Sequence, residues 1–207
     1  IIVHESYEAP GTIIPWAISR GHSVVLTNLH QGDSLPINTE NIDFLVIMGG
    51  PQSPATTTEE CPHYDAQAEM ELIREAVGKG KLIFGVCLGA QLIGNAFGGS
   101  FMSSPEKEIG VWPVTLTEAG KSDPLLKDFP DEFLSGHWHG DMVGLTPEAV
   151  VLAISPGCPR QIIRFADNVY AFQCHLELRQ EEIELLIDAS SDYLSEYSSE
   201  CYVKSIE

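Results

Sequence analysis

The 207-residue sequence is poor in basic residues and rich in acidic ones. It contains 11 Lys and Arg residues against 30 Asp and Glu residues, which gives a formal net charge of −19 at pH 7. A surface with this charge repels the phosphate backbone of nucleic acids and the anionic headgroups of membranes. We therefore expect neither nucleic acid nor a membrane among its partners.

Long hydrophobic runs are also missing. No apolar stretch reaches the roughly 20 residues that a helix needs to cross a bilayer, and no signal-peptide pattern is visible. The chain begins with Ile1, Ile2 and Val3, which read as the inside of a strand, and no Met precedes them. We therefore expect native residues before Ile1.

Cysteine patterns that would indicate a disulfide framework or a zinc knuckle are absent. The five cysteines are odd in number and scattered, and no C-x-x-C pair occurs (Cys61, Cys87, Cys158, Cys174 and Cys201). This pattern favours a reducing compartment, and we expect the cytoplasm. No internal repeat, linker or G-x-x-x-x-G-K-[ST] phosphate-binding motif is visible, so residues 1–207 are expected to form one domain.

Apolar runs alternate with helical patterns along the chain. Strands are predicted at 1–4, 22–27, 43–48, 81–86, 111–117, 150–155, 161–166 and 169–173, and helices at 11–21, 62–77, 88–97 and from 180 onward. This alternation predicts an α/β fold with an open, doubly wound, mostly parallel sheet and helices on both faces. The polar segment 103–110 is expected to be irregular, and 52–60 to be either a lid or a plain connection.

The segment 81–98, KLIFGVCLGAQLIGNAFG, organises the chain. A strand leads through Cys87 into a helix, and Gly85 and Gly89 flank the thiol as G-x-C-x-G, the cysteine form of a nucleophile elbow. Glycines let strand and helix pass closely at a strained turn. At a helix N-terminus Cys87 favours the thiolate, and the N–H of Leu88 can face an oxyanion. The alternative is a small core cysteine after a strand.

A base for this thiol is available late in the chain. His175 and Glu177 are two residues apart at the end of a predicted strand, so their side chains point the same way. Glu177 can orient His175, and His175 can activate Cys87. Gly50, in the Gly-Gly-Pro turn after the strand at 43–48, can complete the oxyanion hole with Leu88, although such a turn can also be merely a tight turn.

The segment 136–141, GHWHGD, is a second dense polar cluster. His137 and His139 could share a metal with Asp141. A stable site would need a further ligand and an outer shell of hydrogen bonds. We therefore expect no metal and no cofactor.

Three segments together, 48–51 (MGGP), 85–91 (GVCLGAQ) and 172–177 (FQCHLE), resemble the class I (triad) glutamine amidotransferases. They occur in the family's order, and the likeness extends from the first strand to about Glu182. It is strongest to stand-alone domains similar to the glutaminase half of GMP synthase. The resemblance implies a flavodoxin-like sheet and a glutamine-hydrolysing Cys87-His175-Glu177 triad.

The resemblance also assigns residues to substrate binding. Gln91 matches the family's glutamine-contacting residue, and the loop with His139 and Asp141 matches the S-H-G-D-type segment at the α-amino and α-carboxylate end of the substrate. By the same resemblance, Glu108 borders the glutamine pocket. The sequence departs from the family at Ala90, where His or Met is common, and at Leu176, where Pro is common.

No synthetase or nucleotide-binding motif follows Glu177, so the resemblance implies that a separate synthetase chain uses the ammonia. Two alternatives remain open at this stage. The same triad could serve a γ-glutamyl peptidase or amide hydrolase, or the chain could be a non-catalytic regulatory module of the same fold.

Overall fold

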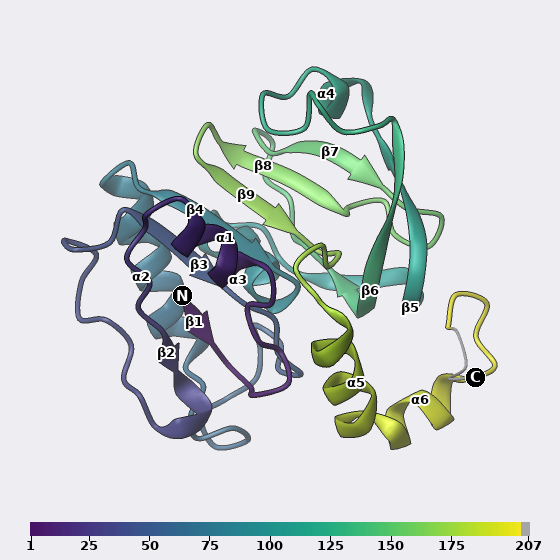
Figure 1. The fold of residues 1–207 in the computed structure, drawn as a ribbon, viewed down its shortest axis with the longest axis horizontal. Helices are drawn as coiled ribbons and strands as arrows, with labels where there is room; N and C mark the ends of the chain where they lie inside the picture. Colours follow the sequence, from purple (N-terminus) through teal and green to yellow (C-terminus); the bar gives the residue numbers. More distant parts are fainter. Residues whose placement is uncertain (204–207) are drawn as a thin grey trace.

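The computed structural model describes residues 1–203 and has the α/β architecture that the sequence predicts (Figure 1). In chain order the elements are β1 (Ile2–Val3), α1 (Ile13–Ser19), β2 (Thr27–Asn28), the 3-10 helix η1 (Leu29–Gln31), β3 (Phe44–Ile47), α2 (Ala66–Gly78), β4 (Leu82–Val86), α3 (Leu88–Ala96), β5 (Met102–Leu116), α4 (Glu118–Lys121), β6 (Glu132–Met142), β7 (Val150–Ile154), β8 (Ile162–Ala166), β9 (Val169–Phe172), α5 (Gln180–Ala189) and α6 (Ser191–Tyr197).

The described strands form a nine-stranded sheet in the order β2-β1-β3-β4-β9-β8-β7-β5-β6. Neighbours from β2 to β9 are parallel, and neighbours from β9 to β6 are antiparallel. Val86, the last residue of β4, is paired with Phe172, the last residue of β9. The residues that follow these two strands therefore meet at one edge of the sheet, where α/β folds bind ligands.

Alternate residues of the parallel strands pack on opposite faces of the sheet, as the two-residue period of a strand requires. One set packs against α2 and α3 (Ile2, Leu45, Ile47 and Ile83). The other set packs against Ile13 of α1 (Val3, Val46 and Val86). The parallel half of the sheet is therefore covered on both faces, which confirms the predicted layer order.

The C-terminal helices pack on the long β5–β6 ribbon. In Figure 1 the yellow helices α5 and α6 lie near the lower end of this ribbon. Leu194 of α6 forms a small apolar core with Ile109 of β5 and with Val203. The ammonium of Lys107 lies 4.2 Å from the ring centre of Tyr197 and adds a cation–π contact.

Three segments differ from their predictions. In place of the strand predicted at 22–27, the structure has only the two-residue strand β2, because its neighbour β1 has only two residues with which it can pair. The segment 103–110, expected to be irregular, belongs to β5, and 136–141, expected as a loop, belongs to β6. These two polar segments pair with each other, with Glu108 opposite His139. Their strand conformation follows from ladder hydrogen bonds and not from an apolar pattern.

All five cysteines are free thiols, and three of them are buried (Cys87, Cys158 and Cys174). The free thiols agree with their odd number and scattered spacing. Among residues 1–203, no helix combines the length and the hydropathy that a membrane span requires.

Candidate active site

Cys87 occupies a strained turn between β4 and α3. Its backbone angles are φ 51° and ψ −106°, and no other non-glycine residue within 1–203 has a positive φ. Such a conformation costs roughly 1–3 kcal/mol and persists only when the surrounding structure enforces it. The Cys87 N–H donates to the carbonyl of Phe172 at 2.8 Å. This bond to the end of β9 helps to hold the thiol at the sheet edge.

The two flanking glycines allow the close approach of strand and helix. A methyl group added to Gly89 would lie 2.2 Å from the carbonyl oxygen of Ile47, and one added to Gly85 would lie 2.5 Å from the backbone of Gly89. The first substitution would force α3 away from β3, and the second would force β4 and α3 apart. Both positions therefore require glycine, because a side chain at either one would block the close packing of helix and strands.

His175 lies beyond the end of β9, where β6 holds its backbone. Its N–H donates to the carbonyl of Gly136 at 2.8 Å, and its own carbonyl accepts from Gly136 N–H at 3.0 Å and from the Ser135 hydroxyl at 2.9 Å. Its buried Nε2 has no hydrogen-bond partner among the described residues. The imidazole lies close enough to Cys87 to influence the pKa of the thiol. Such contacts commonly tighten only when substrate binds.

Glu177 orients this imidazole. The Nδ1 of His175 lies 2.7 Å from Oε1 of Glu177, and both side chains are buried. Burial by itself would lower the pKa of His175, but the charge of Glu177 and the contact with Cys87 raise that pKa well above its usual value. Burial raises the pKa of the Cys87 thiol, and His175 opposes the rise. His175 can thus take the thiol proton and retain it.

Gly50 and Leu88 lie side by side next to the thiol. Leu88 is the first residue of α3, so its N–H has no acceptor within the helix. A methyl group added to Gly50 would lie 2.9 Å from Cδ2 of Leu88, and Gly50 lines the same cleft as Cys87. The structure therefore brings together the two residues from which the sequence predicted an oxyanion hole.

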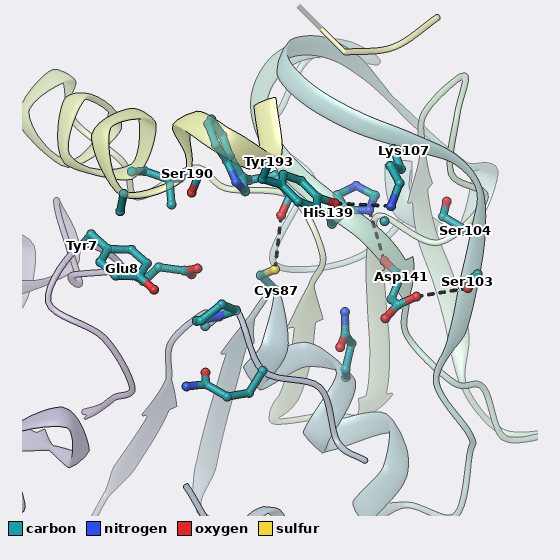
Figure 2. Close-up of a pocket in the computed structure, with 18 of the residues that line it drawn as sticks. Tyr7, Glu8, Cys87, Ser103, Ser104, Lys107, His139, Asp141, Ser190 and Tyr193 are labelled. Carbon is teal, nitrogen blue, oxygen red and sulfur yellow. Dashed lines mark hydrogen bonds between the residues drawn. The ribbon is translucent and has the colours of Figure 1, made fainter. Parts of the chain in front are cut away.

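Cys87 opens into a cleft of about 820 Å³. The loops after β1 and β3 form one side of this cleft, and the β5–β6 ribbon and α5–α6 form the rest. Figure 2 shows Tyr7 and Glu8 on one side of Cys87 and Asp141 on the other. Gln91, from the first turn of α3, also lines the cleft, and its amide donates to Gln173 at 3.3 Å.

Glu8 is a buried carboxyl at this site that sequence reasoning missed. It is 8% exposed. Burial raises its pKa to about 7, against the opposing effect of His175. A methyl group added to Gly49 would lie 1.8 Å from Oε2 of Glu8 and 3.4 Å from Cβ of Cys87, so carboxyl and thiol share the space beside Gly49. No motif marks Glu8. The only available signal was its place in the loop after β1, at the ligand-binding edge.

His139 and Asp141 line the cleft as predicted for substrate-binding candidates, but the His139 ring is engaged elsewhere. Its Nδ1 donates to the carbonyl of Asp141 at 3.1 Å, and its Nε2 lies 3.3 Å from Oε2 of Glu108. Burial lowers its pKa, which favours the neutral imidazole. The Asp141 carboxylate accepts from the Ser103 hydroxyl at 3.2 Å and faces the cleft (Figure 2).

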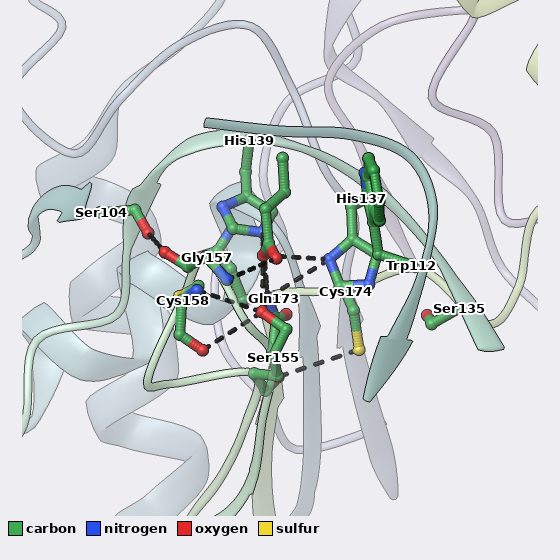
Figure 3. Close-up of polar contacts among 12 residues, drawn as sticks. Ser104, Trp112, Ser135, His137, His139, Ser155, Gly157, Cys158, Gln173 and Cys174 are labelled. Carbon is green, nitrogen blue, oxygen red and sulfur yellow. Dashed lines mark hydrogen bonds and ion pairs between the residues drawn. The ribbon is translucent and has the colours of Figure 1, made fainter. Parts of the chain in front are cut away.

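Glu108 of β5 does not line the cleft but belongs to a buried polar network. Figure 3 shows four other members of this network, His137, His139, Ser155 and Gly157. Its carboxylate accepts from the Ser155 hydroxyl at 2.7 Å, the Gln161 amide at 2.7 Å and the Gly157 N–H at 3.0 Å. Burial alone would raise its pKa, but His137, His139 and the Ser155 hydroxyl hold that pKa well below its usual value.

The metal-ligand set that the sequence suggested does not assemble, because the Asp141 carboxylate is not grouped with His137 and His139 and accepts from Ser103 instead. Glu108 takes the third position, 3.4 Å from Nδ1 of His137. Its oxygens are already satisfied by a hydroxyl, an amide and a backbone N–H. The arrangement is a hydrogen-bond network that joins β5 and β6 to the connection between β7 and β8.

Comparisons with known proteins agree with this geometry. The model of the Glutamine amidotransferase class-I family matches residues 12–187. The glutamine amidotransferase-like protein YfeJ of Salmonella typhimurium is 47% identical over 205 residues, which cover 99% of this chain and 86% of YfeJ. The crystal structure of SMU.1228c has a TM-score of 0.96 at 53% identity and covers 99% of this chain and 87% of that one.

A more distant similarity involves a multidomain enzyme. The glutamine-hydrolyzing GMP synthase of Lactobacillus delbrueckii subsp. bulgaricus is 34% identical over 145 residues, which cover 68% of this chain. The match covers only 25% of that synthase. The chain therefore corresponds to about a quarter of the GMP synthase.

Proposed function

The chain belongs to the class I glutamine amidotransferase family, and from that premise we propose that it hydrolyses glutamine to glutamate and ammonia through Cys87, His175 and Glu177. The observation that carries the proposal is the strained φ of 51° at Cys87 beside an imidazole held at 2.7 Å by Glu177. A thiol, a base and an orienting carboxylate in this order form a nucleophilic triad.

In the first half-reaction, Sγ of Cys87 attacks the side-chain carbonyl carbon of glutamine. His175 takes the thiol proton, and the Gly50 and Leu88 N–H groups stabilise the negative charge on the oxygen. When the C–N bond breaks, His175 gives this proton to the nitrogen, which leaves as ammonia. The product is a glutamyl thioester on Cys87.

In the second half-reaction, water replaces ammonia. His175 accepts a proton from the water as its oxygen attacks the thioester carbon. Breakage of the C–S bond releases glutamate, and the proton returns to the Cys87 sulfur. Gln91, His139 and Asp141 line the cleft. Gln91 is proposed to contact the glutamine, and His139 and Asp141 are proposed to lie at its α-amino and α-carboxylate end.

We propose that a separate synthetase chain consumes the ammonia in the reducing environment of the cytoplasm. The support is the similarity to the glutamine-hydrolyzing GMP synthase noted above and the five free thiols. Ammonia released into bulk water is lost, so we expect slow glutamine hydrolysis by the isolated chain.

The test is a comparison of kcat/KM for free glutamine with kcat/KM for γ-glutamyl peptides, without any partner. We expect measurable glutamate release from glutamine and no large preference for peptides. A large preference for γ-glutamyl peptides would reject the amidotransferase proposal in favour of a γ-glutamyl peptidase with the same triad. Absence of turnover on both substrates would favour the non-catalytic module.

A further inference from the structure

A second group of soft and charged side chains lies beside the cleft, outside the triad. Glu5 comes from the loop after β1, and Gln52, Cys61 and His63 come from the segment between β3 and α2. The Nε2 of His63 lies 3.0 Å from Oε1 of Glu5 and 3.5 Å from Sγ of Cys61. The Gln52 amide lies 2.8 Å from the same Glu5 oxygen and 3.4 Å from the same sulfur.

These separations fit a single four-coordinate ion. Zinc binds sulfur at about 2.3 Å and imidazole nitrogen at about 2.0–2.1 Å, so tetrahedral ligand atoms lie about 3.3–3.6 Å apart. The distances from Cys61 Sγ to His63 Nε2 (3.5 Å) and to the Gln52 amide (3.4 Å) match this range. The distances from Glu5 Oε1 to His63 Nε2 (3.0 Å) and to the Gln52 amide (2.8 Å) are shorter, so Glu5 would have to move away from both by about half an ångström. The His63 ring is a third exposed and can turn.

The donor types select the metal. Thiolate, imidazole and carboxylate together suit zinc, whereas magnesium and calcium take oxygen ligands. We propose that Glu5, Cys61 and His63 bind a zinc-type divalent ion, with the side-chain amide of Gln52 as the fourth ligand. Cys61 would bind as the thiolate and release its proton to solvent. This donor set was not recognised in the sequence, where only Cys61-x-His63 is local.

The amide of Gln52 supports this assignment. Its Oε1 is buried and has no hydrogen-bond partner among the described residues, while its Nε2 faces the cluster. The two ends of an amide are exchanged by a half-turn of the side chain. That turn would present an oxygen to the ion, at the position where the nitrogen now bridges Glu5 and Cys61.

Accessibility separates this cluster from Glu108, His137 and His139. Those three side chains are fully buried and their carboxylate is satisfied by protein donors. The side chains of Glu5 and His63 are 17% and 32% exposed, and Cys61 is also partly exposed. An ion can therefore reach the second cluster from solvent.

An ion in this place would join the two loops that form one side of the active-site cleft. Gln52 is two residues from Gly50, and the Glu5 carbonyl accepts the N–H of Glu8 at 3.2 Å. Gly50, Gln52 and Glu8 all line the cleft with Cys87. The ion would thus connect the oxyanion-hole loop to the loop that carries Glu8.

The test is titration with Co²⁺, which reports thiolate ligation by a near-ultraviolet charge-transfer band and tetrahedral geometry by intense visible bands. The titration is performed in a Cys87→Ser background, so that the triad thiol cannot contribute. We expect one Co²⁺ per chain, both sets of bands, and loss of the bands on addition of Zn²⁺. Zn²⁺ should also raise the Tm of this variant.

Variants identify the ligands. Adding Cys61→Ser should abolish the charge-transfer band and the Zn²⁺-dependent rise in Tm, whereas Cys201→Ser, a matched change at an exposed cysteine outside the cluster, should preserve both. His63→Gln and Glu5→Gln should each raise the Kd for Co²⁺ by at least roughly 10- to 100-fold. That is the loss of metal affinity that follows when a group hydrogen-bonded to a ligand is removed, and removal of a ligand itself should cost no less.

Two results would overturn the proposal. One is the absence of a charge-transfer band in the Cys87→Ser protein while its Tm without metal shows that it is folded. The other is a band that survives Cys61→Ser. Both readouts are independent of glutamine hydrolysis, so they stand or fall separately from the proposed activity.

Discussion

The Nδ1 of His175 lies 2.7 Å from Oε1 of Glu177 in a buried pair at the edge of the sheet. Because the carboxylate accepts the Nδ1 proton, the other nitrogen is the one that can exchange a proton with Cys87. The loop before α1 fixes the backbone of Glu177, since Thr12 N–H donates to its carbonyl at 2.9 Å. The different roles proposed for His175 and Glu177 therefore have a structural basis.

These different roles predict unequal losses of activity. His175→Ala should remove nearly all glutamine hydrolysis. Glu177→Ala should retain a rate roughly 10- to 100-fold higher than that of His175→Ala, because removing the orienting residue of a triad lowers the rate less than removing the base. The measurement is steady-state glutamate release by variants whose far-ultraviolet circular dichroism and Tm show a native fold. Near-normal turnover by a folded His175→Ala protein would mean that another base acts.

The elbow glycines predict a stability difference between two Gly→Ala changes. Gly89→Ala places a methyl group 2.2 Å from the Ile47 carbonyl oxygen and should lower the free energy of unfolding by about 1–3 kcal/mol. Gly78→Ala, at the end of α2, meets nothing within 4 Å and should be neutral or stabilising by up to about 1 kcal/mol. Urea denaturation measures both, and equal effects would contradict the close approach of α3 to β3.

The burial of the Glu8 carboxyl should make the free energy of unfolding depend on pH. Burial raises its pKa from 4.5 to about 7, so between these pH values the folded chain retains a proton that the unfolded chain has released. The contribution of Glu8 to the free energy of unfolding therefore falls as pH rises through this window. Glu8→Gln removes the titration. It should match the native protein at pH 4 and exceed its stability at pH 8 by up to about 3 kcal/mol.

Urea denaturation of both proteins at pH 4, 6 and 8 checks this sign. The difference between the two proteins isolates Glu8 from groups that titrate in both. A stability difference that does not change with pH would show that the Glu8 carboxyl is not desolvated in the folded chain.

The parts of the site that could be predicted depend on local patterns. G-x-C-x-G places Cys87 between a strand and a helix, because its glycines and flanking apolar runs are contiguous in the sequence. His175 and Glu177 share a side of the chain for an equally local reason, the two-residue period of extended backbone. The α/β fold follows from the alternation of such segments and is confirmed by the sheet order.

The remaining features depend on contacts between distant segments. Glu8 lies in a polar loop and becomes a site residue only because β1 and β4 end at the same edge of the sheet. Polar residues 103–110 and 136–141 form strands only because they pair with each other. The proximity of Glu5 to Cys61 and His63 likewise arises from the folded chain, so no local spacing could have indicated it.

The most direct test of the central claim is to trap the glutamyl thioester on Cys87. The protein is mixed with glutamine, quenched in acid within the first turnover and digested for peptide mass analysis. We expect a glutamyl adduct on the Cys87 peptide, removed by hydroxylamine and absent from Cys87→Ser, with Cys61 and Cys201 unmodified. Glutamate release that persists in a folded Cys87→Ser protein, with no adduct on Cys87 of the native chain, would contradict the account.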